Sequence, residues 1–375
     1  MRLFWLIFLP AAAYQCLAIA AAVRHARRGK SHRANANGLP GVSVLKPLRG
    51  LDPNTQEAFA SQVTQNYPQF EVLFGALEEN DPAASEVMRL QRDFPAAPVR
   101  LISGGAEMPN GKVGILVELA RQARYPIRVV NDSDIRVDAD YLAAVTAPLE
   151  DAANGLVTCL YRVKAHNLPA AWEALGIMTD FMPSVLVAQF LGVREFGLGS
   201  TLAFRAEDLE RAGGFAALGE YLADDYQLAK RISGLGLRVV LSTYTVETSL
   251  GDASWLGVWR HQLRWARTIR LSKGGGYLGL PFTQAALWAA AALASGAWWP
   301  AAILLGLRMV SALVSGAMVL ESPLAMRFCW LSPCWDLYSF AIWLASYSGR
   351  GVRWRDRVLT IGPDGRIEKA TRAGI

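Results

Sequence analysis

Two carboxylates stand two residues apart near the middle of the chain, directly after a short apolar run. Residues 127–130 (IRVV) have the composition of a buried strand, and Asp132 and Asp134 follow in the segment NDSD. Mg²⁺ or Mn²⁺ binds one or two such carboxylates and completes its coordination with phosphate oxygens and water. A cation held by Asp132 and Asp134 would neutralise a diphosphate-sugar, whose leaving group is a nucleoside diphosphate. The alternative is an ordinary turn, because Asn, Asp and Ser commonly follow strands.

A single acid, Asp81, follows an earlier strand-like run in the segment EENDP. At a strand end its carboxylate could accept hydrogen bonds from a nucleobase or a ribose. The alternative is a helix N-cap, since Asp before Pro commonly starts a helix. Taken alone, the segment favours the cap.

Two adjacent acids, Asp224 and Asp225, begin an apparent helix that runs to Ile232. One of them could cap this helix and complement its dipole. The pair could also offer a general base for an acceptor hydroxyl. The spacing alone does not separate these two roles.

A basic and aromatic segment, HQLRWAR, covers residues 261–267 and precedes the apolar tail. Arg264 could hold a phosphate through two parallel hydrogen bonds, while Trp265 forms an apolar wall. In isolation the segment favours another interpretation, namely membrane-surface charge with an interfacial tryptophan.

Alternating strands and helices must position these residues. Strand-like runs cover residues 42–45, 71–74, 99–102, 127–130 and 156–161, and helical stretches at 55–64, 83–93 and 112–124 separate the first four. This alternation predicts an α/β fold with a doubly wound, mainly parallel sheet, whose ligands bind beyond the carboxyl ends of the strands. The sequence has no G-x-G-x-x-G or Walker A motif, which disfavours a dinucleotide or P-loop site.

The ends of the chain have the composition of membrane segments. The chain is 52% hydrophobic and only 19% charged, whereas soluble proteins carry about 25% charged residues. Residues 3–23 are apolar apart from Gln15, and a basic run at 24–30 follows. This charge asymmetry predicts one N-terminal transmembrane helix with the following domain in the cytoplasm. A signal peptide is disfavoured because its charge should precede the apolar region.

Apolar stretches return at residues 285–320, interrupted by residues 298–300 and Arg308, and at 328–347. The arginines that follow should stay cytoplasmic, which requires an even number of crossings after the central domain. We therefore expect one of the three apolar pieces to be re-entrant or interfacial. The basic residues in question are Arg350, Arg353, Arg355 and Arg357.

The net charge of +6 lies largely where apolar segments end, so anionic lipid headgroups are a better partner than nucleic acid. The four cysteines form no paired framework, which fits a reduced compartment. We expect five regions: an anchor with its basic flank (1–30), a linker (31–40), a catalytic domain (41–275), C-terminal membrane segments (276–349) and a basic cytoplasmic tail (350–375).

The ordered set Asp81, Asp132-x-Asp134, Asp225 and His261-x-x-Arg264-Trp265 resembles the D, D, D, (Q/R)xxRW pattern of glycosyltransferase families 2 and 21. The segments at 42–50 (VSVLKPLRG), 131–137 (NDSDIRV) and 222–226 (LADDY) narrow the resemblance to ceramide glucosyltransferases and their bacterial relatives, including those of hopanoid biosynthesis. The likeness covers roughly residues 40 to 275.

The resemblance implies a GT-A fold and an inverting, metal-dependent transfer from a UDP-sugar to the hydroxyl of a membrane lipid. Asp132 and Asp134 would hold the metal-bound diphosphate, Asp81 the nucleoside, and Asp225 would be the base. Arg264 and Trp265 would close over the diphosphate. The expected location is the bacterial inner membrane, as a multi-pass protein with its catalytic domain in the cytoplasm.

Two further positions carry over by resemblance. His261 stands where the family has Gln or Arg, and as a phosphate donor it is a weaker prediction than Arg264. Lys112 lies where the family carries a basic loop and could touch phosphate, but a solvated lysine is an equal interpretation.

Two stretches are candidates for the acceptor site. Residues 168–191 are too apolar for a surface loop yet carry Glu173 and Asp180, which fits an interfacial amphipathic helix beside the active site or a buried helix. Residues 197–205 form a glycine-bearing loop entering a strand, where family members shape the acceptor pocket, or else an ordinary turn. Two rival functions are a processive polysaccharide synthase and a non-catalytic binding protein for nucleotide-sugar or lipid.

Overall fold

The computed structural model describes residues 2–29, 39–354 and 357–372. The chain forms two compact units. The helical unit contains Met1–Gly29, Arg162–Gly192 and Asp252–Ile375, and the sheet unit contains Lys30–Tyr161 and Val193–Gly251. Residues 162–192 and 252–275, which the sequence analysis assigned to the catalytic domain, thus group with the helical unit. Most of the predicted linker and Arg355 lie outside the described residues.

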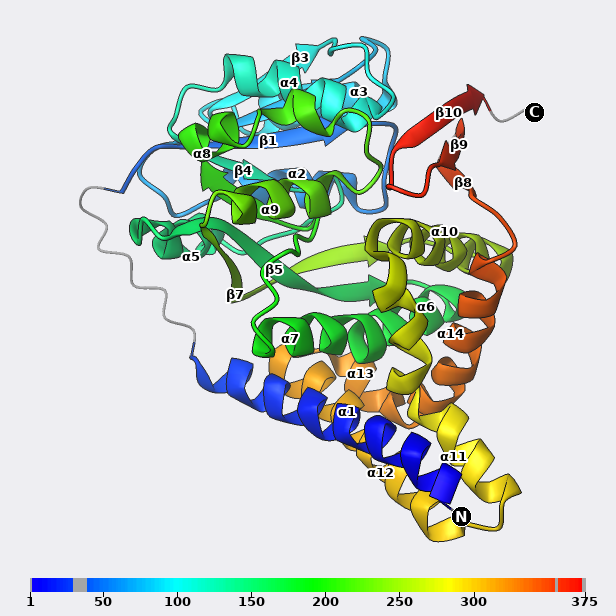
Figure 1. Cartoon of the computed structure of the whole chain (residues 1–375). Helices are drawn as coiled ribbons and strands as arrows, with labels where there is room; N and C mark the ends of the chain where they lie inside the picture. Colours follow the sequence, from blue (N-terminus) through cyan, green and yellow to red (C-terminus); the bar gives the residue numbers. More distant parts are fainter. Residues whose placement is uncertain (1, 30–38, 355–356, 373–375) are drawn as a thin grey trace. The chain divides into compact units, whose positions relative to one another are not determined.

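The sheet unit is built on seven strands in the order β3-β2-β1-β4-β6-β5-β7 (Figure 1). They are β1 (Val42–Leu48), β2 (Phe70–Ala76), β3 (Val99–Ser103), β4 (Ile127–Val130), β5 (Asn154–Ala165), β6 (Leu202–Arg205) and β7 (Arg238–Leu250). Strands β1 to β4 are parallel neighbours, with Val42 opposite both Phe70 and Ile127. Strand β6 runs antiparallel between β4 and β5. The predicted mainly parallel α/β sheet is confirmed, and the antiparallel β6 is an addition.

Side chains of the parallel strands alternate between two apolar cores. Val44 and Val129 face one core, and Leu45 and Val130 face the other. The first core is covered by α2 (Thr55–Val63), α3 (Pro82–Asp93) and α5 (Tyr141–Thr146), and the second by α4 (Gly111–Gln122), α8 (Ala206–Arg211) and α9 (Asp224–Gly234). A sheet covered on both faces needs apolar residues at nearly every strand position, which explains the uninterrupted apolar runs.

The helical unit contains helices from both ends of the chain and two internal stretches (Figure 1). Its α-helices are α1 (Arg2–Arg27), α6 (Leu168–Gly176), α7 (Met182–Phe190), α10 (Trp255–Lys273), α11 (Ala285–Ala294), α12 (Trp298–Leu313), α13 (Pro323–Phe328) and α14 (Ser332–Ser346). Helix α1 packs on α11 and α12 through small residues such as Ala11, Ala289 and Ala301, which let helix backbones approach closely.

Among the described residues, one helical segment is long and apolar enough to cross a bilayer: Trp298–Val319, with a mean hydropathy of 1.9. Gly275–Thr283 and Ala285–Ala294 pass the same test only as a pair bent by 60°, which fits a broken span or a re-entrant loop. Helix α1 has 26 residues, roughly 39 Å at 1.5 Å per residue. Its buried amide side chain, Gln15, donates to the carbonyl of Thr283 at 2.7 Å.

A buried ion pair holds the helical unit together. Arg308 of α12 donates to Asp336 of α14 at 2.8 Å and to the carbonyl of Thr179 at 2.7 Å. The second oxygen of Asp336 accepts the backbone N–H of Ala286 at the start of α11. Arg308, which interrupts the apolar stretch in the sequence, therefore has a carboxylate partner on a neighbouring helix.

The predicted basic tail contains a small antiparallel sheet. Strands β8 (Gly351–Trp354), β9 (Arg357–Ile361) and β10 (Ile367–Arg372) pair in the order β10-β9-β8. Leu359 and Ile361 are buried, so this region has apolar contacts of its own.

Candidate active site

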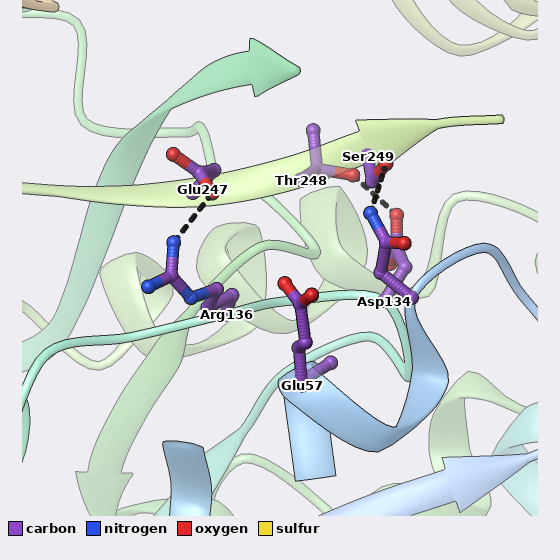
Figure 2. Close-up of a pocket in the computed structure, with 8 residues that line it drawn as sticks. Glu57, Asp134, Arg136, Glu247, Thr248 and Ser249 are labelled. Atoms are coloured by element: carbon purple, nitrogen blue, oxygen red, sulfur yellow. Dashed lines mark hydrogen bonds and ion pairs between the residues drawn. The ribbon is translucent and has the colours of Figure 1, made fainter. Parts of the chain in front are cut away.

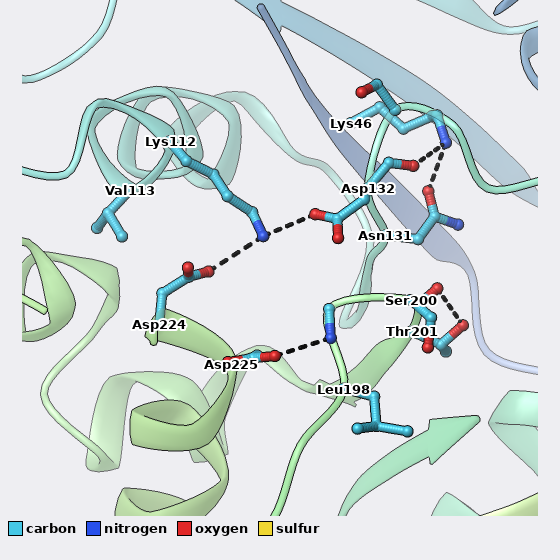
Figure 3. A network of polar contacts seen from close by, with 12 residues as sticks. Lys46, Lys112, Val113, Asn131, Asp132, Leu198, Ser200, Thr201, Asp224 and Asp225 are labelled. Atoms are coloured by element: carbon cyan, nitrogen blue, oxygen red, sulfur yellow. Dashed lines mark hydrogen bonds and ion pairs between the residues drawn. The ribbon is translucent and has the colours of Figure 1, made fainter. Parts of the chain in front are cut away.

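The candidate site lies at the carboxyl ends of β1 and β4, the two strands at which the parallel order reverses. This switch point is where doubly wound sheets bind ligands. Five segments far apart in sequence meet here: the end of β1, the start of α4, the NDSD turn after β4, the loop before β6 and the start of α9 (Figure 3).

A buried lysine anchors the NDSD turn from below. Lys46 of β1 is fully buried and donates to Asn131 Oδ1 at 2.7 Å and to the backbone carbonyl of Asp132 at 2.8 Å. Burial lowers the pKa of Lys46 from 10.5 to about 7, although nearby aspartates oppose this shift. Asn131 also donates to Tyr141 Oη at 3.3 Å, so the turn is fixed from two sides.

Lys112 joins the two acidic motifs. Its ammonium lies 2.8 Å from Asp132 Oδ1 and 3.3 Å from Asp224 Oδ2, and its side chain is only 16% exposed (Figure 3). Burial alone would lower its pKa, but the Asp132 and Asp224 carboxylates outweigh burial and raise it. The interpretation of Lys112 as a solvated lysine is therefore wrong: it is a charged bridge between the acids.

Gly199 links the turn to the acidic pair through its backbone. Its carbonyl accepts the N–H of Asp132 at 3.1 Å, and its own N–H donates to Asp225 Oδ2 at 3.0 Å. A Cβ at this position would lie 2.8 Å from Asp132 Oδ2, closer than real Cβ contacts allow. A residue larger than glycine would therefore push the Asp132 carboxylate aside. The sequence of residues 197–205 allows either an acceptor-site loop or an ordinary turn, and in the structure Gly199 of this loop contacts both the NDSD turn and Asp225.

Both carboxylate oxygens of Asp225 accept a backbone N–H. Its Oδ1 accepts the N–H of Tyr226 at 2.7 Å, while Ala223 occupies the N-cap position of α9. Burial and the neighbouring Asp224 raise the pKa of Asp225 from 3.8 to about 6. Such a carboxylate is mostly ionised at neutral pH and yet can accept a proton during a reaction.

Asp134 faces the other side of the turn. Thr248 of β7 donates to its carboxylate, and Ser133 donates to Asp52 in the loop after β1. Burial and the Asp132 charge raise the pKa of Asp134 from 3.8 to about 6. A cavity of about 10 Å³ beside Asp134 is lined by Glu57, Arg136, Glu247, Thr248 and neighbouring residues (Figure 2). This volume holds a single water, so the cavity is not a sugar or nucleoside pocket.

Asp81 is the N-cap of α3, as one interpretation of the sequence proposed. Its Oδ1 accepts the N–H of Ala83 at 2.9 Å. The same carboxylate accepts the N–H of Gly50 at 2.9 Å, which ties it to the loop after β1. The same loop contains Asp52, which accepts a hydrogen bond from Ser133 of the NDSD turn. Asp81 is therefore connected to the NDSD turn through this loop. A role in nucleoside binding remains a proposal.

Helix α10, which belongs to the helical unit, contains Arg264, Trp265 and His261. His261 Nδ1 lies 2.5 Å from Glu173 Oε1, and the Trp265 ring contacts the rings of His261 and Phe181 at 5.0 and 5.4 Å. Asp180 accepts from Trp335 and Ser339 of α14. Both acids of the 168–191 stretch therefore have partners inside the helical unit, which favours the buried-helix interpretation.

Asp132 and Asp134 fit a hard cation by their chemistry. Both offer carboxylate oxygens, and a cation would relieve the repulsion that contributes to the raised pKa of Asp134. Within the described part of the chain, no three His, Cys, Asp or Glu side chains gather into an all-protein metal cage. A Mg²⁺ or Mn²⁺ ion would thus need phosphate oxygens and water as further ligands, as is usual for nucleotide sites.

Four residues of the site are not predicted from the sequence: Lys46, Asp52, Gly199 as a linker, and Asp224 as the partner of Lys112. Lys46 and Asp52 were visible only as parts of the β1 segment and its loop. A pattern of strand ends could have suggested them, because β1 and β4 are neighbours at the switch point.

The strand order and the switch point of the sheet unit give it a GT-A-like fold. Among solved structures, the mannosyltransferase PcManGT from Pyrobaculum calidifontis, in complex with GDP-Man and Mn2+, superposes with a TM-score of 0.52 at 20% identity, covering 91% of this chain and 99% of that one. This likeness supports the fold.

The model of glycosyl transferase family 21 matches residues 3–367, and the chain belongs to this family. Two relatives in Caenorhabditis elegans are named as ceramide glucosyltransferases. Ceramide glucosyltransferase 1 is 30% identical over 232 residues, or 61% of this chain and 50% of that protein. Ceramide glucosyltransferase 3 is 28% identical over 235 residues, or 62% of this chain and 51% of that protein. The chain therefore spans about half the length of these relatives.

Proposed function

We propose that this chain moves one sugar from a UDP-sugar to the hydroxyl of a membrane lipid, with inversion at the anomeric carbon. The observation that carries the proposal is the convergence of Asp132, Lys112 and Asp225 at one sheet edge within one unit. Family membership and the ceramide glucosyltransferase relatives support a lipid as the acceptor.

The donor would bind through its diphosphate at the NDSD turn. Asp132 and Asp134 would hold a divalent cation. When bound, this cation neutralises the negative charge of the diphosphate and so stabilises the nucleoside diphosphate as a leaving group. Lys112 supplies a positive charge beside Asp132 and can hold either the carboxylate or a phosphate. Asp81 would receive the nucleoside, and Arg264 with Trp265 would cover the diphosphate, as the family pattern implies.

Asp225 would take the proton of the acceptor hydroxyl as its oxygen attacks the anomeric carbon and the nucleoside diphosphate leaves. A single displacement needs one base and produces inversion. The raised pKa of Asp225 lets it accept this proton, and the N–H of Gly199 keeps the carboxylate oriented. Protonated Asp225 then loses its proton to solvent.

We further propose that helix α1 and segments of 276–349 anchor the protein in a bacterial inner membrane with the sheet unit in the cytoplasm. The apolar segment Trp298–Val319 and the bent pair at 275–294 support an anchored protein. The basic residues in the last turn of α1 support the orientation, since such charges remain cytoplasmic.

The direct test is a panel of labelled UDP-sugars with purified protein in nanodiscs that contain ceramide, a hopanoid polyol or diacylglycerol. The proposal expects one UDP-sugar and one lipid to give a product with a single added sugar, dependent on Mg²⁺ or Mn²⁺. Mass spectrometry measures the number of sugars. A polymeric product would indicate a processive synthase, and no transfer to any lipid would contradict the proposal.

A further inference from the structure

We propose that Glu173, His261 and Tyr338 form a hydroxyl-binding site, walled by tryptophan rings, that takes the headgroup of a neutral hydroxyl-bearing lipid. All the residues of this site belong to the helical unit. The statement that this bound lipid is the sugar acceptor rests on the proposed function.

The carboxylate of Glu173 is buried but only half used. Glu173 of α6 is 2% exposed, and both of its donors, His261 Nδ1 at 2.5 Å and Gln262 Nε2 at 2.7 Å, reach the same oxygen, Oε1. Over the described residues, no side chain or backbone N–H donates to Oε2. Oε2 is not among the fully buried side-chain atoms without a partner, so a ligand hydroxyl could reach it and donate to it.

Tyr338 of α14 has a buried hydroxyl group without a hydrogen-bond partner among the described residues. Glu173 is its charged neighbour. Its ring is enclosed by three tryptophans, with ring centroids at 5.8 Å for Trp172, 5.7 Å for Trp259 and 5.2 Å for Trp335. Buried tyrosine hydroxyls usually find a partner, so this one is poised for a group that is not part of the chain.

His261 offers a third position. With Nδ1 directed to Glu173, the ring presents Nε2 on a side chain that is 29% exposed, and no described residue bonds to this nitrogen. A carboxylate on one ring nitrogen fixes the tautomer in which the other accepts a hydrogen bond. The site thus combines two acceptors, Glu173 Oε2 and His261 Nε2, with one hydroxyl that can donate or accept, Tyr338 Oη.

This set of polar atoms identifies the ligand chemistry. A hydroxyl group donates and accepts at once and so can satisfy a carboxylate oxygen and a tyrosine hydroxyl together. A lipid phosphate at neutral pH brings only acceptors and a negative charge, which Glu173 would repel. A quaternary ammonium would suit the tryptophan rings but would leave the Tyr338 hydroxyl unsatisfied. The tryptophan walls match the apolar part next to a lipid headgroup.

The deciding variant is Tyr338→Phe, which removes one oxygen and keeps the ring. If Tyr338 were only structural, its loss would leave lipid binding unchanged, because the hydroxyl has no partner to lose. The proposal expects weaker binding of ceramide by about fivefold to tenfold, together with unchanged or higher thermal stability. The matched control is Tyr277→Phe: its hydroxyl donates to Ser346 at 3.0 Å, so this variant should lose stability and keep its lipid affinity.

Binding is measured on the full chain in phosphatidylcholine nanodiscs by native mass spectrometry, without any UDP-sugar. The probes are ceramide and diacylglycerol, each beside its O-methylated form. We expect the wild type to prefer the free hydroxyl, and Tyr338→Phe and Glu173→Ala to lose that preference, with Glu173→Gln intermediate because its amide oxygen still accepts from His261.

Equal binding of free and methylated lipids by the wild type would overturn the inference, as would wild-type affinity in Tyr338→Phe. The proposed function fails separately: a wild type that selects free hydroxyls but transfers no sugar would contradict the enzyme assignment and keep this site. In an active wild type, Tyr338→Phe should raise the KM for the lipid and leave the KM for the UDP-sugar unchanged.

Discussion

The candidate catalytic edge of the sheet unit and the tryptophan-walled site of the helical unit treat their polar atoms in opposite ways. At the sheet edge, Asp132 and Asp225 each accept from a donor within the chain, and Lys112 bridges two acids. In the helical unit, Glu173 has one oxygen without a donor and the Tyr338 hydroxyl has no partner among the described residues. The difference indicates that the first site is organised before its ligand binds, whereas the second is completed by its ligand.

The largest expected effect tests the organised site. Asp225→Asn keeps the shape of the side chain but removes the base, so we expect transfer to fall by about 10²- to 10⁴-fold. UDP affinity should stay near wild type, whereas the free energy of unfolding should fall by about 1 kcal/mol, because an amide can accept only one of the two N–H groups that Asp225 accepts. Initial rates of sugar transfer measure the effect, and the exposed Asp364→Asn serves as the control. Retention of more than about a tenth of the activity would contradict the assignment of Asp225 as the base.

A second comparison lies within the helical unit, between the unsatisfied Tyr338 and the paired Arg308–Asp336. Asp336→Ala leaves Arg308 buried without its carboxylate, so the free energy of unfolding should fall by about 3–5 kcal/mol. Replacing both residues together, as Arg308→Met with Asp336→Leu, should restore most of that loss. Unfolding in detergent micelles measures both variants. A single variant as stable as the wild type would show that the pair does not hold α12 and α14.

Gly199→Ala probes the organisation of the sheet edge without removing a polar group. The new Cβ would meet Asp132 Oδ2 at 2.8 Å, and the shift needed to relieve this contact would move the Asp132 carboxylate relative to Lys112. We expect kcat/KM to fall about tenfold to a hundredfold, since small displacements of reacting groups cost about this much. Gly234→Ala in α9 is the control, because a Cβ added there would meet no atom of the described residues within 4 Å. Equal activity of the two variants would contradict the bridging role.

The pH dependence gives the smallest effect and concerns the same base. The pKa of Asp225 is raised from 3.8 to about 6, so the carboxylate is ionised above pH 6 and protonated below it. Because only the ionised form accepts a proton, kcat/KM should fall about tenfold per pH unit below 6. Rates between pH 5 and 8 check this prediction. A profile that stays flat down to pH 5 would require a base with an ordinary carboxylate pKa.

The parts of the site that the sequence predicted follow from local pattern. Asp132 and Asp134 stand directly after an apolar strand, and parallel strands bring their carboxyl ends to one edge. Asp81 before Pro82 predicted a helix cap, and the structure confirms this cap. These features depend on neighbours in sequence, so composition and spacing contain them.

The parts that the sequence did not predict depend on distant partners. Lys46 meets Asn131 across 85 positions, and His261 meets Glu173 across 88. The sequence allows Lys112 to be either a phosphate-binding or a solvated lysine. Only the fold brings its ammonium group between Asp132 and Asp224. The antiparallel β6 has no periodicity that distinguishes its direction, since pairing partners set it.

The most direct test asks whether the sheet edge binds the nucleotide and the tryptophan-walled site binds the lipid. It measures two affinities on two variants: that for UDP with Mn²⁺, and that for ceramide compared with its O-methylated form. We predict that Asp132→Asn weakens UDP binding by at least about tenfold and keeps the ceramide preference. Tyr338→Phe should keep the UDP affinity and lose the ceramide preference. A variant that changed both affinities together, or an Asp132→Asn protein that bound UDP like the wild type, would contradict the account.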